Sequence, residues 1–389
     1  MIFLIGPRQV GKTTLAKSMI PDLKPGFNYF NWDLTSDRKF LATQLFPGKI
    51  NLKEPGRGVL VFDEIHKYPR WKNTLKGLFD SNEPDTHWII TGSAALNVYR
   101  KGQDSLLGRS FLYLLCPFSV AEITGSPVIQ SDPTAHLLNL KMSKPDNETQ
   151  EAFDSLMRFG GFPEPFLKAT ESFLARWRTS RLERLINQDL GMTEHLKHLP
   201  ILEQLMFLLP ERVGSPLSLN SLREDLEIHH ATAKHWIELL ERVFYGFAVR
   251  PYTGKLSRAL KKEPKWYLWD WSEIADKGKR FENMMAVHLM KFVQYINNMG
   301  LGNLSLHYVK DKEKREADFL IVNEKKPVLL IECKSKIKTV SESLRYFAHH
   351  LRVPRVMQLS MDSQESWLTE DKSIKREVAS AATFLKQLI

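Results

Sequence analysis

The chain has 389 residues, of which 43% are hydrophobic and 26% are charged. At about 150 residues per domain, this length predicts two or three domains with ordinary buried cores, and the composition excludes intrinsic disorder and collagen-like repeats. Every apolar run has the length of a β-strand, well below the roughly 20 residues of a membrane-spanning helix. We therefore expect no membrane partner, and the two cysteines, too few for a disulfide framework, favour the cytoplasm.

Basic residues outnumber acidic residues by 55 to 45, so the net charge is +10. Such an excess favours binding to a polyanion, either nucleic acid or an anionic membrane surface, and charge alone does not choose between them. The densest basic segment spans residues 250–265, and we interpret it as an exposed electrostatic footprint. Its basic residues are Arg250, Lys255, Arg258, Lys261, Lys262 and Lys265.

Short apolar runs alternate with amphipathic segments over the first 125 residues. This spacing is typical of βα units around a buried parallel sheet. The runs cover residues 2–5, 27–32, 59–62, 88–90 and 111–115. Residues 127–149 are polar and proline-containing, which predicts a long connection, and residues 150–245 carry mainly helical patterns. From residue 279 the predicted order is helix (281–297), strands (305–309, 317–322 and 328–334) and helix (341–350).

A glycine-rich motif follows the first apolar run directly. Residues 6–13 read GPRQVGKT, which matches G-x-x-x-x-G-K-[ST], and a helical segment follows. In such a loop the backbone amides face nucleotide phosphates, the lysine reaches the β- and γ-phosphates, and the hydroxyl ligates Mg²⁺. The sequence therefore predicts binding of ATP with Mg²⁺. The expected binding residues are Gly6, Pro7, Arg8, Gln9, Val10, Gly11, Lys12, Thr13 and Thr14.

The third apolar run ends in two acids, in the sequence VLVFDE at residues 59–64. Hydrolysis of a triphosphate needs one carboxylate for the Mg²⁺ water shell and another that orients or deprotonates the attacking water. We assign these roles to Asp63 and Glu64. Two acids at a strand end also suit a helix N-cap, but their position after a phosphate-binding loop favours a hydrolytic site.

Two further segments carry candidate catalytic residues. Residues 88–93 read WIITGS, a buried strand whose terminal hydroxyl residues would contact the γ-phosphate or the lytic water. Ser93 is the first candidate and Thr91 the second, and a helix N-cap is the alternative. Arg109 would stabilise transition-state charge, including in a neighbouring subunit of a homo-oligomer, and the alternative is an ordinary surface arginine.

These motifs resemble the AAA+ ATPases of a bacterial and archaeal group that couples a P-loop domain to a C-terminal domain of uncharacterised function. The resemblance spans residue 1 to about residue 335 and implies an ATPase core, a helical linker, a winged helix and a nuclease-like end. Its motifs are residues 6–14, DEIHK at 63–67 with Trp71 after it, ITGS at 90–93, LLGR at 106–109 and GGFPE at 160–164.

A helix-turn-helix pattern lies in the middle of the chain. Residues 218–226 predict a capped short helix, residues 229–243 a second helix, and the segments around the basic stretch two strands of a winged helix. The winged-helix fold binds DNA in many proteins and is also widely used for contacts with other proteins. In a DNA complex, the residues facing the major groove would be His229, His230, Lys234 and His235, and those touching phosphates Lys255, Arg258, Lys261 and Lys262.

The C-terminal strands carry the pattern D-x13-E-x-K, formed by Asp318, Glu332 and Lys334. Phosphodiester hydrolysis needs carboxylates that hold Mg²⁺ and a lysine that positions the nucleophile. Glu332 and Lys334 share one face of their strand. The pattern resembles the PD-(D/E)xK nucleases, which implies Asp318 and Glu332 as metal ligands, Lys334 as base or nucleophile positioner, and Glu282 as an auxiliary acid. Chance acidic motifs and inactive members of that superfamily are the alternative.

Together these patterns predict an α/β protein with a parallel P-loop NTPase (AAA+/ASCE) sheet, a helical linker with a winged helix, and a restriction-endonuclease-like α/β domain. The expected domains are the ATPase core at 1–125, the linker and helical lid at 126–195, the winged helix at 196–275 and the nuclease-like domain at 276–389. We expect a cytoplasmic ATPase that acts on double-stranded or branched DNA. The alternatives are a slow nucleotide switch with an inactive nuclease fold, an ATP-regulated nuclease, and a branched-DNA motor.

Overall fold

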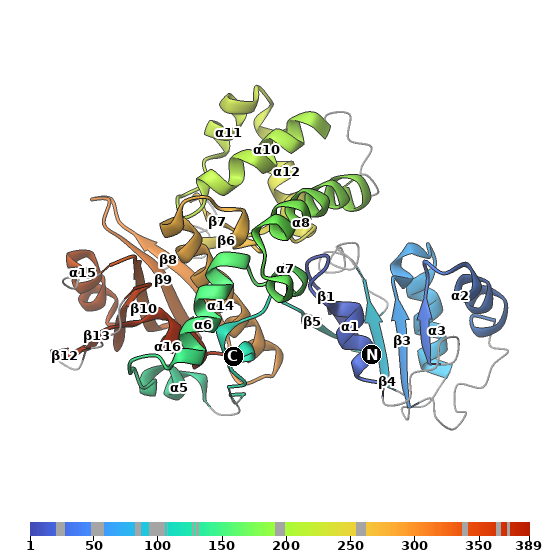
Figure 1. The fold of residues 1–389 in the computed structure, drawn as a ribbon, viewed down its shortest axis with the longest axis horizontal. Helices are drawn as coiled ribbons and strands as arrows, with labels where there is room; N and C mark the ends of the chain where they lie inside the picture. The colour runs from blue at the N-terminus through green and yellow to red at the C-terminus, as the bar shows by residue number, and fades with distance from the viewer. Residues whose placement is uncertain are drawn as a thin grey trace. The chain divides into compact units, whose positions relative to one another are not determined.

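The computed structural model describes most of the chain, as two compact units whose elements are labelled in Figure 1. The first unit consists mainly of Met1–Cys116, and the second mainly of Pro117–Leu182, Lys197–Glu241 and Tyr245–Ile389. The described residues are 1–20, 28–47, 58–81, 87–92, 106, 108–126, 128–129, 132–190, 199–253, 262–336, 341–362, 367–371 and 374–389.

The first unit is built on a sheet of five described strands, in which all neighbours are parallel. In spatial order these are β2 (Tyr29–Asn31), β3 (Val59–Asp63), β4 (His87–Thr91), β1 (Ile2–Ile5) and β5 (Phe111–Leu114). Its helices are α1 (Lys12–Ser18), α2 (Thr35–Phe40) and α3 (Trp71–Ser81), with a 3₁₀ turn at Ile65–Lys67 and a π-helical turn at Leu41–Leu45. The side chains of the central strands are buried, as the continuous apolar runs predicted for a parallel sheet. The predicted α/β class is confirmed, and the sheet is consistent with a P-loop NTPase fold.

Helices make up the first part of the second unit. They are α4 (Val120–Ile123), α5 (Pro133–Asn139), α6 (Asn147–Phe159), α7 (Pro163–Lys168), α8 (Glu171–Arg184), α10 (Leu199–Arg212), α11 (Leu219–Leu226) and α12 (His230–Arg242). The π-helical turn at Leu185–Leu190, which follows α8, belongs to the first unit. The segment predicted as a long connection contains α5, because Asp132 caps this helix and Pro133 occupies its first turn. The GGFPE motif is a turn, since Gly160 ends α6 with φ +78° and a Cβ on Gly161 would lie 2.4 Å from the Trp271 ring.

The rest of the second unit is a mixed sheet flanked by helices. Its described strands are, in spatial order, β12 (Trp367–Asp371), β13 (Ile374–Ser380), β11 (Arg355–Ser360), β10 (Lys326–Lys334), β9 (Glu316–Asn323), β8 (Leu304–Lys310), β6 (Gly246–Pro251) and β7 (Lys265–Leu268). The helices are α14 (Lys277–Asn298), α15 (Glu342–Leu351) and α16 (Ala381–Lys386), with a 3₁₀ turn at Trp271–Glu273. The predicted β8, β9 and β10 are present, whereas β11 to β13 were not predicted.

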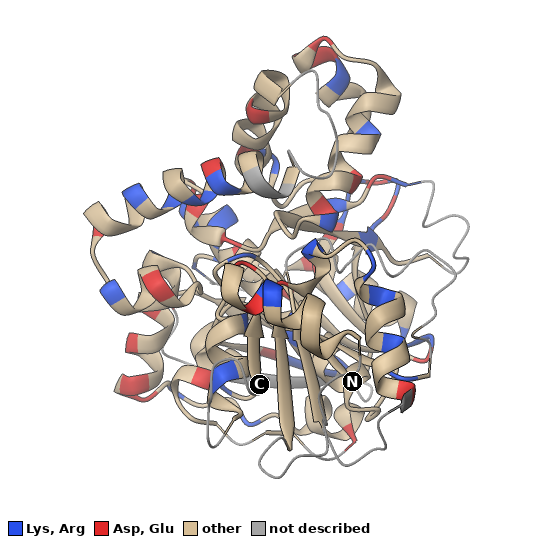
Figure 2. Cartoon of the chain, turned by 90° about the vertical axis from the view of Figure 1, so that its right-hand side faces the viewer, with Lys and Arg blue, Asp and Glu red and all other residues tan. Residues whose placement is uncertain are grey.

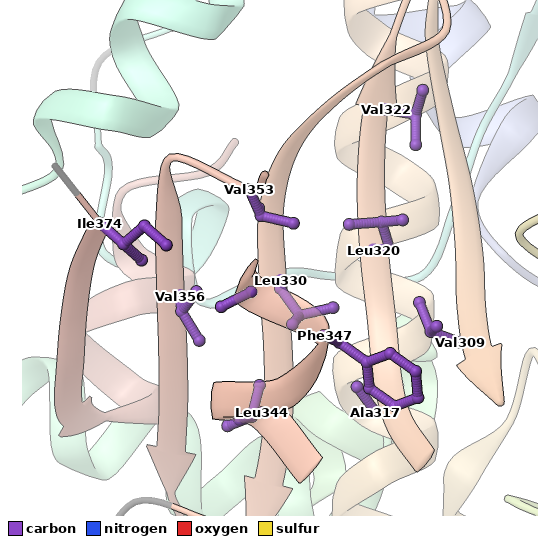
Figure 3. Close-up of a cluster of buried hydrophobic side chains, with 11 residues drawn as sticks. Val309, Ala317, Leu320, Val322, Leu330, Leu344, Phe347, Val353, Val356 and Ile374 are labelled. Atoms are coloured by element: carbon purple, nitrogen blue, oxygen red, sulfur yellow. The ribbon is translucent and has the colours of Figure 1, made fainter. Parts of the chain in front are cut away.

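The hairpin β6–β7 belongs to the same sheet as the C-terminal strands. β6 runs antiparallel to β7 and parallel to β8, through the pairs Arg250 with His307 and Pro251 with Tyr308. On one face of this sheet, Phe347 and Leu344 of α15 pack among buried aliphatic side chains of the strands, as Figure 3 shows. This packing fixes β9 and β10, the two strands that carry the predicted acidic pattern.

Among the described helices, none combines the length and the apolar character that crossing a membrane requires.

Candidate functional site

The glycine-rich loop joins β1 to α1, and its two glycines adopt conformations that other residues rarely take. Gly6 has φ +144°, and a Cβ there would lie 2.3 Å from the carbonyl oxygen of Leu115. Gly11 has φ +102° and directly precedes α1. The loop can therefore follow this tight path only with glycine at these positions.

Lys12 lies over its own loop. Its Nζ donates hydrogen bonds to the carbonyl oxygens of Gly6 at 3.0 Å and Pro7 at 2.7 Å, and the residue is buried. The ammonium thus faces the inside of the loop, where the backbone amides of a P-loop bind phosphates. Of the neighbouring predicted binding residues, Val10 is buried and Thr14 is exposed on α1.

Asp63 is the centre of the site. It ends β3, is 3% exposed, and accepts hydrogen bonds from three hydroxyl groups. Thr13 Oγ1 on α1 lies 3.0 Å from Oδ2, Tyr29 Oη on β2 lies 2.8 Å from the same oxygen, and Thr91 Oγ1 on β4 donates to Oδ1. Burial, followed by the charge of Asp63, raises the pKa of the Tyr29 hydroxyl, which remains a donor. Side chains from three neighbouring strands and the first turn of α1 therefore converge on one carboxylate, with Asp63 and Thr91 at the carboxyl ends of β3 and β4 and Tyr29 at the start of β2.

Glu64 follows Asp63 in a left-handed conformation, with φ +57°. Its backbone N–H donates to the carbonyl oxygen of Thr91 at 3.1 Å, and its carboxylate lies 3.2 Å from Nζ of Lys67. Lys67 also contacts Asp33 at 2.7 Å. The side chain of Glu64 is 19% exposed, and the residue directly follows Asp63 in the chain.

The pair Thr13 and Asp63 fits Mg²⁺ bound together with a nucleotide. A hydroxyl and a carboxylate are the hard oxygen ligands that this ion prefers, and the two groups already lie within 3.2 Å of each other. Sequence reasoning predicted both residues but missed Tyr29, because a tyrosine in a buried strand is ordinarily a core residue.

The other candidate catalytic residues of the first unit do not all lie at Asp63. Thr91, the second sensor candidate, contacts Asp63, whereas Ser93 falls outside the described residues. Arg109 precedes β5 and pairs with Asp80 at 2.6 Å. Because β5 runs parallel to β1, Arg109 lies at the amino-terminal edge of the sheet, opposite the loop of its own chain.

The predicted helix-turn-helix elements are present as α11 and α12, and Ser218 caps the first of them. Of the residues expected to face DNA, three are exposed (His229, His230 and Lys234) and His235 is half-buried. A cavity of about 450 Å³ between α12 and the hairpin is lined by basic and acidic side chains, among them Lys234 and Glu238. Figure 2 shows basic and acidic residues together on several helices of the chain.

The expectation that Lys265 belongs to an exposed basic footprint is wrong. The residue is 1% exposed, because three carboxylates from α14 and β9 surround its ammonium group. Within the same segment Arg250 and Lys262 are exposed, as predicted. The other three basic residues of the segment lie outside the described residues: Lys255, Arg258 and Lys261.

The C-terminal pattern residues lie on neighbouring elements. Asp318 is on β9, Glu332 and Lys334 are on β10, and Glu282 is on α14. Lys334 Nζ contacts Glu332 at 2.9 Å; burial lowers the pKa of Lys334, but the hydrogen bond and charge of Glu332 outweigh this and raise it. Among the side chains that the structure describes, no three His, Cys, Asp or Glu residues converge in a way that could hold a metal ion.

Three family models match consecutive parts of the chain. Residues 1–124 match an AAA domain, residues 150–274 a domain of unknown function (DUF8612), and residues 277–373 another domain of unknown function (DUF4143).

Similar proteins occur in bacteria and archaea. Uncharacterized proteins of Mycobacterium bovis and Mycobacterium tuberculosis are 22% identical over 270 residues, which cover 69% of this chain and 54% of theirs. The chain thus spans about half the length of these relatives. An uncharacterized protein of Methanocaldococcus jannaschii is 25% identical over 370 residues, covering 85% of this chain and 75% of that one.

Among solved structures, the Bacillus subtilis DNA clamp loader delta protein is 11% identical to this chain. The alignment covers 62% of this chain and 83% of that one, and its TM-score of 0.24 does not establish a shared fold. The domain match and the geometry around Asp63 together support an AAA-type P-loop ATPase domain at the N-terminus.

Proposed function

We propose that this protein is a cytoplasmic, Mg²⁺-dependent ATPase that acts on DNA. The proposal that the protein hydrolyses ATP is based on one observation. Thr13 of the phosphate-binding loop contacts Asp63 at the end of β3, and Glu64 is next to Asp63. Asp63 suits Mg²⁺ bound together with the nucleotide, and the second carboxylate, Glu64, suits activation of water. The arrangement supports binding of ATP and attack of water on its γ-phosphate.

Each residue has a role that follows from its position. Lys12 binds the β- and γ-phosphates, and the loop amides bind the remaining phosphate oxygens. Mg²⁺ bound with ATP supplies charge that offsets the phosphates, and Thr13 and Asp63 would hold it. Glu64 accepts a proton from the attacking water or orients it. Thr91 keeps Asp63 in place through its hydroxyl group, and Ser93 is the proposed contact to the γ-phosphate.

Arg109 acts in a neighbouring subunit of a homo-oligomer. This proposal is supported by its place at the sheet edge opposite its own loop, from which it cannot reach its own nucleotide. Mixing Arg109→Ala with Lys12→Ala protein tests it, since each active site between a Lys12-containing subunit and an Arg109-containing neighbour would be complete. Partial recovery of ATP turnover is expected, and no recovery would refute action between subunits.

The proposal that the protein binds DNA is based on α11, α12 and the β6–β7 hairpin, which we propose to be a winged helix. Exposed His229, His230 and Lys234 at the start of α12 would face the major groove, and the segment with Lys262 would touch phosphates. The net charge of +10 supports attraction to the duplex.

Two other functions remain candidates. Asp318, Glu332 and Lys334 on adjacent strands favour an ATP-regulated nuclease, with Glu282 as its auxiliary acid. Alternatively, the protein is a slow nucleotide switch whose winged helix and inactive nuclease fold contact proteins. A motor on branched DNA is a form of the main proposal.

The deciding experiment measures ATP turnover in Mg²⁺ without DNA, with linear duplex and with four-way DNA, while the DNA is followed on a gel. The matched pair Lys234→Ala and Lys326→Ala removes an exposed lysine from α12 and from β10 respectively. We expect DNA to stimulate turnover and Lys234→Ala to need more DNA than Lys326→Ala for the same stimulation. Equal turnover with and without DNA would refute the DNA-coupled ATPase in favour of the nucleotide switch, and cleaved DNA would favour the nuclease.

A further inference from the structure

A buried lysine lies at the centre of the C-terminal acidic cluster. Nζ of Lys265, on β7, is 2.6 Å from Glu316, 3.1 Å from Glu282 and 3.4 Å from Asp318. The lysine is 1% exposed, so it cannot exchange these carboxylates for water without a change of structure. A charged group at this depth is stable only with such compensation.

Each carboxylate of the cluster is held by a second donor. Tyr267 Oη donates to Glu282 at 2.7 Å, the backbone N–H of Cys333 donates to Asp318 at 2.8 Å, and Lys310 Nζ contacts Glu316 at 2.7 Å. The carboxylates therefore keep their places around Lys265. Burial alone would lower the pKa of Lys265, but the charges of Glu282, Asp318 and Glu316 outweigh it, so the lysine remains an ammonium ion.

The same oxygens would be needed by a metal ion. Carboxylates bind Mg²⁺ at about 2.0–2.1 Å, so an ion held by Glu282 and Asp318 would lie where the ammonium now contacts both. Lys265 would then have to share a buried space with a divalent cation, and the two positive charges would repel each other at close range. The donor chemistry fits a metal ion, but the space does not.

We propose that Lys265 is the resident cation of this cluster and takes the place of a divalent metal ion. The C-terminal domain then holds no metal at Glu282 and Asp318, and removing the ammonium group creates a metal site there. This inference concerns the second unit alone, so it can fail or hold independently of the ATPase. If it holds, the nuclease candidate loses the pair Glu282 and Asp318 as metal ligands.

Binding of Mn²⁺ to the full-length protein without nucleotide, measured by electron paramagnetic resonance, tests the proposal. The variants are Lys265→Met, which keeps the length of the side chain, and Lys326→Met, which removes an exposed lysine from β10 as a control. We expect Lys265→Met to bind one more Mn²⁺ ion per chain than wild type and Lys326→Met, and the added Asp318→Asn change to abolish this extra site.

The wild-type protein provides a second readout if Lys265→Met does not fold. Wild type and Asp318→Asn are expected to bind the same number of Mn²⁺ ions. An ion that wild type binds and Asp318→Asn loses would overturn the proposal, and so would a folded Lys265→Met protein without a new site.

Discussion

His288 in α14 is a buried histidine whose hydrogen bonds require the neutral ring. Its Nε2 accepts a hydrogen bond from the backbone N–H of Val120 at 3.2 Å, while Nδ1 lies 2.8 Å from the carbonyl oxygen of Met284, to which it donates. A second proton on Nε2 would face the N–H of Val120. Burial lowers the pKa of His288 to about 3, and the hydrogen bond to Met284 opposes this only in part.

The pH dependence follows from the difference between the folded and unfolded chains. An unfolded histidine has a pKa of about 6.5, so below that pH the unfolded chain binds a proton that the folded chain does not. The free energy of unfolding therefore falls by about 1.4 kcal/mol for each pH unit between about 6.5 and about 3, and His288 causes no change above that range. Between about pH 7.5 and about pH 5, the loss from His288 amounts to about 2 kcal/mol.

Urea unfolding followed by tryptophan fluorescence measures this effect, with His288→Gln as the reference that cannot titrate. The difference between the two proteins cancels other groups, such as Glu273, whose pKa burial raises to about 7 and which lowers stability as the pH rises. We expect the advantage of wild type over His288→Gln to shrink by about 2 kcal/mol from about pH 7.5 to about pH 5. Parallel pH profiles for the two proteins would refute the reasoning.

Two further substitutions test other parts of the structure. Gly6→Ala would push a methyl group against the Leu115 carbonyl oxygen, so affinity for a fluorescent ATP analogue should fall at least tenfold, and unchanged affinity would contradict the loop geometry. Arg181→Leu would leave Glu273 and Asp270 buried without their ion-pair partner, at 2.7 and 3.6 Å from it, and should lower the free energy of unfolding by about 3–5 kcal/mol in urea. The loss should be smaller near pH 5, because Glu273 then takes up a proton, and a loss that does not change with pH would argue against this cause.

The parallel sheet of the first unit, and the meeting of its motifs at one site, could be predicted because these motifs carry their own structural context. A P-loop must follow a buried strand, and an acid pair at the end of another apolar run must come near it when both strands are parallel. The contacts of Asp63 with Thr13 and Thr91 agree with that reasoning. Tyr29 was missed because the pattern of a strand predicts on which face of the sheet a side chain lies, but does not predict its hydrogen-bond partner.

Lys265 shows the limit of reasoning from local charge. In the sequence, Lys265 follows several basic residues of the kind that usually lie at the surface. Its carboxylate partners are 17 to 53 positions away in the chain, and only folding brings them to it. One signal was available, since Lys265 begins the apolar segment KWYLW, where a charge needs a buried partner. The strands β11 to β13 were missed because their polar residues interrupt the alternating pattern, as at Gln358 and Glu377, which are buried in the structure.

Glu64 is proposed to promote hydrolysis of ATP bound at the glycine-rich loop. ATP turnover in Mg²⁺ and binding of a fluorescent ATP analogue should be measured together for wild type, Glu64→Gln and Lys12→Ala. We predict that Glu64→Gln binds ATP as wild type does and loses turnover by about 100-fold or more, the range of a general base, while Lys12→Ala loses binding as well. Turnover by Glu64→Gln at the wild-type rate would contradict the account.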